Sequence, residues 1–363
     1  MEKKVVKLGV VGLWRGKDVV AGIVGDDNVI LRAICDKRQD RLGEAERFFK
    51  KEKKVKDLLV FESYEELLCS DVDAVFVATD APFHAEHAIQ ALEAGKHVIS
   101  EIPTVFTVEE GRKLRAAVRA HPELKYMAGE NCCYWAFVQA WKQMYEEGKF
   151  GEIVYAEGEY LHAAHPSRVK AKNYPDNYWR TNLNAIQYLT HELGPLLYIM
   201  NDRVVSVSCM EPDNKYNPFK KGAENGVALF RTAKGAVIRI LICFGAYVNQ
   251  DHNFSMLGTK GMIETDRTKP LGEAHSFARM EEVPDSFRNK LEIPVTLHFV
   301  GESDAGHGGS DAKMMRAFIK CIVEDTEPPI DVDAGLRMSL PGIYAHQSAA
   351  RGGALIEIPD PEE

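Results

Sequence analysis

The sequence has no excess of basic residues: 54 Asp and Glu outnumber 45 Lys and Arg, and the formal net charge is −9. A nucleic-acid-binding domain usually carries a basic face, and a membrane-surface helix is rich in Lys and Arg, so neither partner is expected. The basic run at 50–56 stands alone and is typical of a solvated helix end or loop. No stretch reaches the ~18 uninterrupted apolar residues that cross a membrane.

Paired and CxxC-spaced cysteines are also lacking, which argues against further classes of protein. Seven cysteines are an odd number, which argues against a disulfide framework. Cys132 and Cys133 are adjacent and have no CxxC partner, so we expect no zinc or other metal site. Residues 1–10 lead directly into an apolar segment without the features of a secretory signal. These points favour a cytoplasmic protein.

The first 130 residues alternate short β-branched apolar runs with segments of helical spacing. The apolar runs are 5–13, 29–36, 72–80 and 96–103, and the helical segments are 39–51, 84–95 and 108–120. This alternation predicts βαβ units in a doubly wound parallel sheet, so we interpret residues 1–130 as a Rossmann domain that binds NAD.

Residues suited to a dinucleotide stand where these strands end, which is where such sheets bind ligands. Gly12, Thr79 and Glu101 each follow or close an apolar run. The glycine loop departs from the G-x-G-x-x-G fingerprint, because Trp14 stands where the second glycine is expected. Taken alone, the loop is a weak signal.

Asp36 strengthens the cofactor prediction. It closes the second apolar run, where a carboxylate can bind both ribose hydroxyls and repel a 2′-phosphate, so NAD is favoured over NADP. Lys37 and Arg38 follow immediately and keep NADP as an alternative. Asp36 could also serve only as a helix N-cap or turn residue.

The pattern of apolar and polar residues changes after the first domain, and we assign residues 131–363 to a second, α+β domain. Apolar and polar residues alternate along its segments, which predicts a large, mainly antiparallel sheet with one open face. Two segments near the end, 311–325 and 333–353, have helical spacing, and we expect a C-terminal helix to pack back on the Rossmann domain. The open sheet face suggests a homodimer or homotetramer.

Residues 184–200 predict a helix with two different faces. Five apolar residues form its core stripe: Ile186, Leu189, Leu193, Leu197 and Met200. Tyr188 and His191 share the opposite face. Pro195 cannot donate to the carbonyl of His191, so we expect a kink just after His191. The pair could line a binding site, or it could lie on an ordinary solvent face.

Taken together, the motifs resemble the Gfo/Idh/MocA family of NAD(P)-dependent sugar oxidoreductases over nearly the whole chain. The resemblance rests on the glycine loop, on 79–103, on GHGGSD at 306–311 and on 340–353. Ordinary dehydrogenases of that family have Glu-Lys-Pro after the fourth strand, and their lysine assists proton transfer. Here Ile102 takes that place, between Glu101 and Pro103.

The NAD-dependent glycosidases of glycoside hydrolase family 109 also lack that lysine. The chain is similar to them at 129–134, 158–162, 178–180 and 188–195. The resemblance implies a substrate and catalytic shell of Glu130, Tyr160, His162, Tyr188 and His191. It also implies cofactor contacts from Gly12, Leu13, Trp14, Arg15, Asp36, Thr79, His84, Glu101 and Asn131. A structural role stays open for Glu130 and for His162, and Trp179 is expected to pack or to stack on a sugar.

The implied function is cleavage of a glycoside by oxidation at a sugar carbon, C3, then elimination, hydration and reduction. The expected partner is a small glycoside or sugar. An NAD(P)-dependent sugar dehydrogenase that releases a keto-sugar is the alternative, and a non-catalytic NAD-binding regulator is a third reading. Four basic side chains could meet an anionic sugar, although a solvated loop explains them as well: Arg168, Lys170, Lys172 and Arg180.

Overall fold

The computed structural model describes residues 4–163, 169–174, 176–248, 251–268, 276–283, 291–293 and 305–361. The chain divides into two compact units: residues 1–131 with 301–336, and residues 132–300 with 337–363. The chain thus re-enters the first unit late, whereas the sequence alone suggests a single boundary near residue 130. No helix among the described residues is long and apolar enough to cross a membrane.

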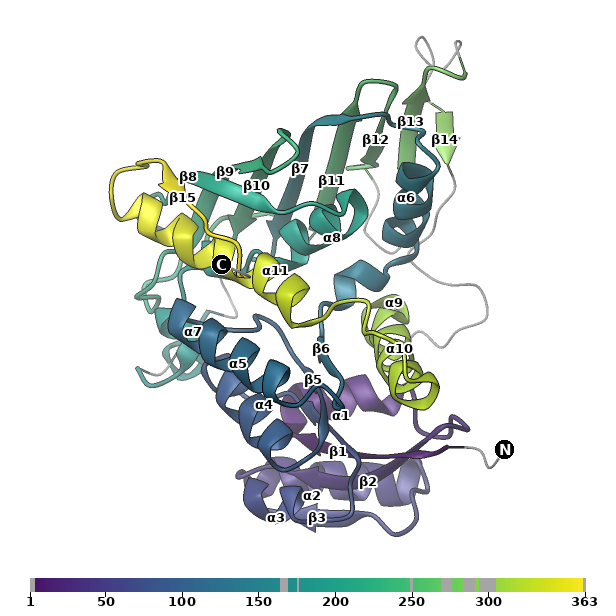
Figure 1. Cartoon of the computed structure of the whole chain (residues 1–363). Coiled ribbons are helices and arrows are strands. Elements are labelled where there is room, and N and C mark those ends of the chain that lie inside the picture. Colours follow the sequence, from purple (N-terminus) through teal and green to yellow (C-terminus); the bar gives the residue numbers. More distant parts are fainter. Residues whose placement is uncertain are drawn as a thin grey trace. The chain divides into compact units, whose positions relative to one another are not determined.

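A parallel sheet forms the centre of the first unit (Figure 1). Its strand order is β3-β2-β1-β4-β5-β6, and every pair is parallel. The strands are β1 (Val6–Val11), β2 (Val29–Cys35), β3 (Leu59–Phe61), β4 (Ala74–Val77), β5 (His97–Ser100) and β6 (Tyr126–Ala128). The winding reverses between β1 and β4, so the predicted Rossmann sheet is confirmed. The sequence does not reveal β3 and β6, which are too short to show a period.

Helices connect these strands. They are α1 (Leu13–Ala21), α2 (Gln39–Arg47) with a π-turn at Phe48–Glu52, α3 (Tyr64–Leu68), α4 (His84–Glu93) and α5 (Val108–Ala120), with a 3₁₀ turn at Ala81–Phe83. Two later helices, α9 (Ala305–Gly308) and α10 (Ser310–Glu324), belong to the same unit. α10 packs on α1 and on the residues that follow it. Arg316 of α10 pairs with Asp26, and Ala312 lies so close to Gly22 that a Cβ on this glycine would be 3.0 Å away.

The second unit is built on a sheet of nine described strands in the order β14-β13-β12-β11-β7-β10-β9-β8-β15 (Figure 1). Only β7 and β10 pair in parallel among them, so the predicted, mainly antiparallel sheet is confirmed. The strands are β7 (Ile153–Leu161), β8 (Val204–Met210), β9 (Asn225–Thr232), β10 (Val237–Cys243), β11 (Asp251–Gly258), β12 (Gly261–Thr265), β13 (Ser276–Met280), β14 (Leu291–Ile293) and β15 (Ile356–Glu357).

The core of this unit lies between one sheet face and the helices α6 (Ala136–Glu146) and α8 (Thr190–Met200). Burial alternates along β9, as expected for a sheet with one open face. Trp141 is the largest fully buried side chain among the described residues. Shorter helical turns are Asn131–Tyr134, Ala171–Asn173, α7 (Trp179–Asn182) and Ala185–Tyr188, and α11 (Val332–Ala349) begins in the first unit and ends in the second.

The segment 184–200 is not one kinked helix. A 3₁₀ turn, with Asn184 and Gln187 forming a capping box, ends at Tyr188, and α8 begins at Thr190 and continues through Pro195. The break therefore comes before His191 rather than after it, because one hydrogen bond lost at a proline does not end this helix. The predicted core stripe is confirmed, since all five of its residues are buried.

Candidate functional site

In the first unit, the turn after β1 forms a narrow cradle. Gly12 has φ +89°, and a Cβ there would lie 2.3 Å from the carbonyl oxygen of Ala78, so only glycine fits. α1 begins at the next residue, and the backbone N–H of Leu13 donates to a carboxylate oxygen of Asp36 at 2.8 Å. The backbone N–H of Arg38 donates to the other oxygen at 2.9 Å. Two amides thus fix the buried Asp36 carboxylate at the end of β2.

Trp14 replaces the second glycine without filling the cradle, because its side chain is 57% exposed and packs under the guanidinium of Arg41. Arg38 is held by Asp40 at 3.0 and 2.5 Å. Lys37 lies 5.6 Å from the ring of Phe83. Lys37 and Arg38, the two basic residues that left NADP as an alternative cofactor, therefore both have partners in the same unit.

Glu101 has a specific partner. Its carboxylate accepts a hydrogen bond from Nε of Arg15 at 3.0 Å, and the rest of that guanidinium binds Asp311 at 2.8 and 2.7 Å. Asp311 also accepts from Asn131 at 2.9 Å and lies 3.1 Å from Nδ1 of His307. Burial opposes ionisation of Asp311, but hydrogen bonds from His307 and Arg15 hold its pKa well below the usual range. Glu101 thus joins the end of β5 to α1 and α10.

The residues around Glu101 make contacts within the same unit. Ile102 is buried and precedes Pro103 through a cis peptide bond. Both ring nitrogens of the buried His84 lie 3.0 Å from backbone carbonyl oxygens, of Pro103 and of Thr79. Burial lowers the pKa of His84, and a neutral ring donates to one of these two carbonyls. The hydroxyl of Thr79 lies 3.0 Å from Nδ1 of His87.

In the second unit, four predicted residues gather around the start of α8. The ring of Tyr160 on β7 lies 5.6 Å from His191 and 5.2 Å from His162. Tyr188 lies 5.4 Å from His191, with the two rings nearly perpendicular. Burial raises the pKa of Tyr160 well above its usual value, so it remains a neutral phenol. Tyr188 and His191 are half-buried, and His162 is exposed.

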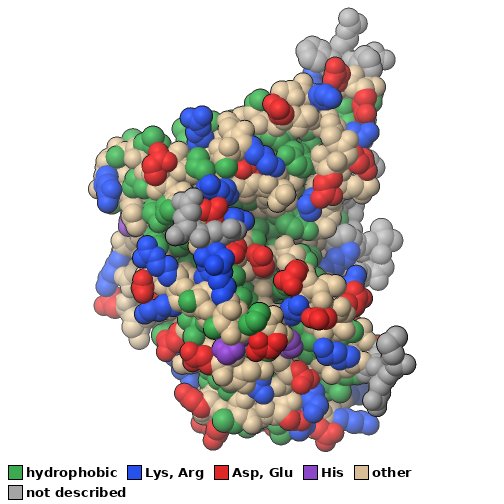
Figure 2. Space-filling view, in the orientation of Figure 1, with side chains coloured by type: hydrophobic (Ala, Val, Ile, Leu, Met, Phe, Trp, Pro, Cys, Tyr) green, Lys and Arg blue, Asp and Glu red, His purple; other side chains and the backbone are tan. Residues whose placement is uncertain are grey.

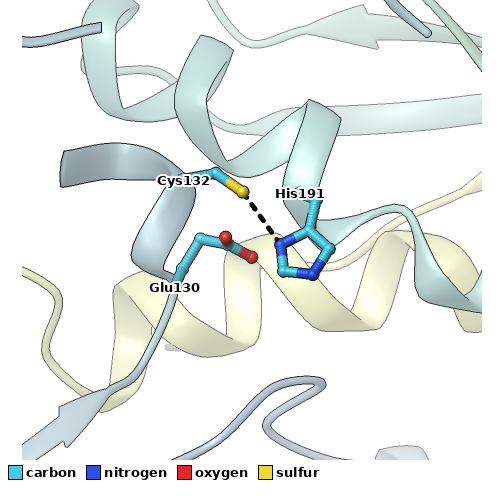
Figure 3. A group of neighbouring side chains, drawn as sticks. All are labelled: Glu130, Cys132 and His191. Carbon is cyan, nitrogen blue, oxygen red and sulfur yellow. Dashed lines mark hydrogen bonds between the residues drawn. The ribbon is translucent and has the colours of Figure 1, made fainter. Parts of the chain in front are cut away.

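A thiol contacts the imidazole of this cluster. Sγ of Cys132 lies 3.1 Å from Nδ1 of His191 (Figure 3). The contact engages one ring nitrogen, and the tautomer of His191 depends on which partner donates. Glu130, which Figure 3 also labels, precedes Cys132 by two residues; it is buried and belongs to the first unit.

Arg180 was open to two readings, contact with an anionic sugar or a place in a solvated loop. Its guanidinium lies 4.3 Å from the ring of Trp179 and 5.1 Å from that of Tyr188, so it packs on aromatic rings of this cluster. Burial lowers its pKa, but the neighbouring Tyr188 and Tyr178 outweigh that and raise it. Lys170 and Lys172 are exposed as expected, and Arg168 lies outside the described residues.

Lys220 lies behind Arg180. Its ammonium donates to the backbone carbonyl of Arg180 at 2.6 Å and to that of Leu183. Burial and the nearby guanidinium lower the pKa of Lys220 to about 8. Nothing in the spacing of the sequence signals this contact, because it joins α7 to a loop more than thirty residues away.

Comparison with known proteins identifies the chain. Residues 6–129 match the oxidoreductase family with the NAD-binding Rossmann fold, and residues 134–362 match the glycosyl hydrolase 109 C-terminal domain. The chain belongs to glycosyl hydrolase family 109, within the Gfo/Idh/MocA oxidoreductases. The resemblance drawn from the motifs is thus confirmed: this family-109 protein is an NAD-dependent enzyme of the sugar oxidoreductase and glycosidase type, and its cofactor is NAD.

The family-109 protein is similar to curated relatives over nearly its whole length. A "Glycosyl hydrolase family 109 protein" of Solibacter usitatus is 29% identical over 98% of this chain and 88% of its own. An "Alpha-N-acetylgalactosaminidase" of Shewanella oneidensis is 27% identical, with 98% and 85% covered. Apo scyllo-inositol dehydrogenase from Lactobacillus casei has the same fold, with a TM-score of 0.78, 20% identity, and 98% and 99% of the two chains covered.

Proposed function

We propose that this chain cleaves glycosides by temporary oxidation of a sugar carbon, C3, with no net change of redox state. Bound NAD supplies the hydride acceptor and later the hydride donor. The observation that carries the proposal is the Tyr188–His191 pair, 5.4 Å apart, within a unit that matches a glycosidase family. The two side chains lie outside the core stripe of α8.

The route explains cleavage without the two carboxylates that ordinary glycosidases use. Oxidation of the C3 hydroxyl to a ketone acidifies the proton on C2. A base removes this proton, and the group on C1 leaves with the bonding electrons and takes up a proton. Water then adds to the conjugated double bond, with its hydroxyl at C1 and a proton at C2, and reduction at C3 restores the sugar. The balance is glycoside plus water giving sugar plus free aglycone.

The first unit fits the dinucleotide. Only glycine fits at residue 12, because a side chain there would collide with the backbone of Ala78, and the turn leads directly into α1, whose N-terminus would bind a pyrophosphate. The Asp36 carboxylate, held by two backbone amides, would meet the ribose hydroxyls. Trp14 and Thr79 would line the same strand ends. Arg15, Glu101 and His84 support the site through their contacts with each other and with backbone carbonyls.

His191 would accept the proton of the C3 hydroxyl as the hydride leaves, since an imidazole suits a base near neutral pH. If Nδ1 donates to the Cys132 thiol, Nε2 is left as the basic atom. Tyr188 would work at C2. A tyrosine base requires a nearby positive charge, and the Arg180 guanidinium lies 5.1 Å from its ring. Tyr160, a neutral phenol, would donate a hydrogen bond to the sugar.

The test compares released aglycone with accumulated NADH. The purified protein is incubated with NAD⁺ and a panel of 4-nitrophenyl glycosides, including the α-N-acetylgalactosaminide that the name of the Shewanella relative suggests. Release of nitrophenol without net NADH, and with deuterium at C2 of the product in D₂O, supports the proposal. NADH accumulation in proportion to a keto-sugar would instead make the chain a dehydrogenase, which the Tyr188–His191 pair could also serve.

A further inference from the structure

Glu192 is a buried carboxylate for which the proposed route has no role. It follows His191 in α8 and is fully buried. Its Oε1 lies 2.6 Å from Nδ1 of His252, which projects from β11. An ionised carboxylate is strongly disfavoured in such a place unless a partner compensates its charge.

The sheet has a glycine, Gly158, at the point where the side chain of Glu192 packs against it. Gly158 lies on β7 among positions that face the core. A Cβ on Gly158 would lie 2.8 Å from Cβ of Glu192 and 3.3 Å from Cδ1 of Ile240. Glycine weakens a strand interior, and within a sheet it often marks a close approach of another group. Here the group that approaches is the side chain of Glu192.

His252 connects the carboxylate to the site. Its ring stacks on Tyr160, with the centroids 4.2 Å apart and an angle of 23° between the planes. The ring of Trp135 also contacts His252, with the centroids 5.0 Å apart and an angle of 70° between the planes. An aromatic face attracts a cation, and a carboxylate on the ring nitrogen favours the charged imidazole, so both contacts stabilise an imidazolium.

We propose that Glu192 and His252 form a positioning dyad for Tyr160, in which the buried carboxylate holds an imidazolium flat against the phenol ring. The dyad fixes the direction in which the Tyr160 hydroxyl donates its hydrogen bond. Its effect on turnover rests on the function proposed above, whereas its ionisation state does not. Neither residue needs to touch the substrate.

Other ionisable groups near the dyad do not replace Glu192. His191 lies 6.3 Å from His252, ring to ring, and contacts Cys132 and Tyr188 on its other sides. On β11, the carboxylate of Asp251 accepts the backbone N–H of His252. Tyr160 stays neutral because burial raises its pKa. Glu192 is thus the acid that we expect to control the charge of the His252 ring.

The first test measures the charge of His252 directly. In protein labelled at histidine ¹³Cε1, the resonance that disappears in His252→Asn belongs to His252, and its pH titration gives the pKa. We expect Glu192→Gln to lower that pKa by about one unit or more, because an opposite charge is lost. An unchanged titration would overturn the dyad. The result needs no substrate, so it holds even if no glycoside is cleaved.

The second test asks whether the dyad acts through Tyr160. With a substrate found as above, we expect kcat of Glu192→Gln to fall about tenfold or more at pH 8 and to recover at acid pH, where His252 protonates without its partner. In His252→Asn, kcat should fall by a similar factor and should not recover at acid pH. We expect kcat of Tyr160→Phe to fall as far as that of His252→Asn.

A purely structural pair predicts a different pattern. The double variant Glu192→Leu/His252→Phe replaces the pair with apolar side chains and should still fold, as judged by circular dichroism and Tm. We expect it to be as slow as Tyr160→Phe. Wild-type kcat in the double variant, or a loss in Glu192→Gln that is equal at every pH, would contradict the proposal.

Discussion

At the scale of single residues, His191 is set apart by its contacts: a thiol on Nδ1 and aromatic rings on two sides. We expect His191→Ala to lower kcat at least ~10²-fold, as is typical when a general base is lost. NAD binding, measured by calorimetry, should not change. Cys132→Ser keeps a group that can hydrogen-bond Nδ1 and should be much milder than Cys132→Ala. Near-normal activity of His191→Ala would remove it from the mechanism.

Cofactor preference is a second question at this scale. Arg38 follows Asp36, but its guanidinium is held by Asp40. We expect Asp40→Asn to release Arg38 for a 2′-phosphate and to strengthen NADP binding several-fold, with little change for NAD. Asp36→Asn should weaken NAD binding instead. Equal NADP affinity in Asp40→Asn and the unmodified protein would show that Arg38 does not reach the ribose.

Single residues were predictable where the motif itself carried them. The Tyr188–His191 pair follows from a spacing of three along one segment, and the structure brings the two rings together. The contact between Glu192 and His252 was not predictable, because it joins α8 to β11 over a separation of 60 residues. Arg180 lies close to Tyr188 in the sequence, but a periodic pattern contains no information about the packing of its guanidinium on that ring.

At the scale of elements, Asp311 ties α10 to α1 and to the end of β5 through Arg15. We expect Asp311→Asn to lower the free energy of unfolding at pH 7 by about 3 kcal/mol, because the guanidinium loses a buried partner. Urea unfolding measures this. Asp71→Asn is the matched control: Asp71 also binds two basic side chains, but it is exposed, so its loss should change the stability much less than the loss of Asp311.

The stabilisation that Asp311 provides should decrease at low pH. The pKa of folded Asp311 lies below that of an unfolded aspartate, so its stabilising effect is present above about pH 4 and is lost as the pH falls through the folded pKa. The difference between the protein and Asp311→Asn should therefore shrink in acid. A constant difference from pH 7 to pH 2.5 would contradict the assignment.

A second contact between elements, that of His346 with Glu211, stabilises the protein with the opposite pH dependence. Nδ1 of His346 on α11 lies 3.0 Å from a carboxylate oxygen of Glu211, which follows β8, and this hydrogen bond raises the pKa of His346. The raised pKa means that the stabilisation is complete below about pH 6.5 and is lost as the pH rises through the folded pKa. We expect His346→Gln to lower Tm more at pH 6 than at pH 8.5, as measured by calorimetry.

Elements with strong patterns were predictable from the sequence, and weak ones were not. β-Branched runs gave β1, β2, β4 and β5. The three-residue strands β3 and β6 exist because longer neighbours pair with them. The break at Leu189 follows a 3₁₀ turn capped by Asn184 and Gln187, and α8 continues through Pro195, so the proline did not predict where the segment breaks.

At the scale of the whole molecule, acidic and basic side chains are interspersed over the face that Figure 2 shows. The open face of the large sheet is different in its strands β8, β9 and β10. Val227 pairs with Met210 on one side and with Leu241 on the other, and Leu229 lies two residues along the same strand. Val227, Leu229 and Met210 are exposed, so apolar side chains lie next to each other there.

Neighbouring exposed apolar side chains are typical of an interaction surface, and we expect a second copy of the chain as the partner. Light scattering after size exclusion should give a dimer or tetramer. Leu229→Glu puts a charge at the centre of the area and should shift the mass toward that of one chain. Ile30→Glu, an equally exposed apolar position on β2, is the control and should leave the mass unchanged. A carboxylate buried in the interface without a partner would separate the copies, so a Leu229→Glu variant of unchanged mass would exclude this face as the interface. A monomeric unmodified protein would exclude it as well.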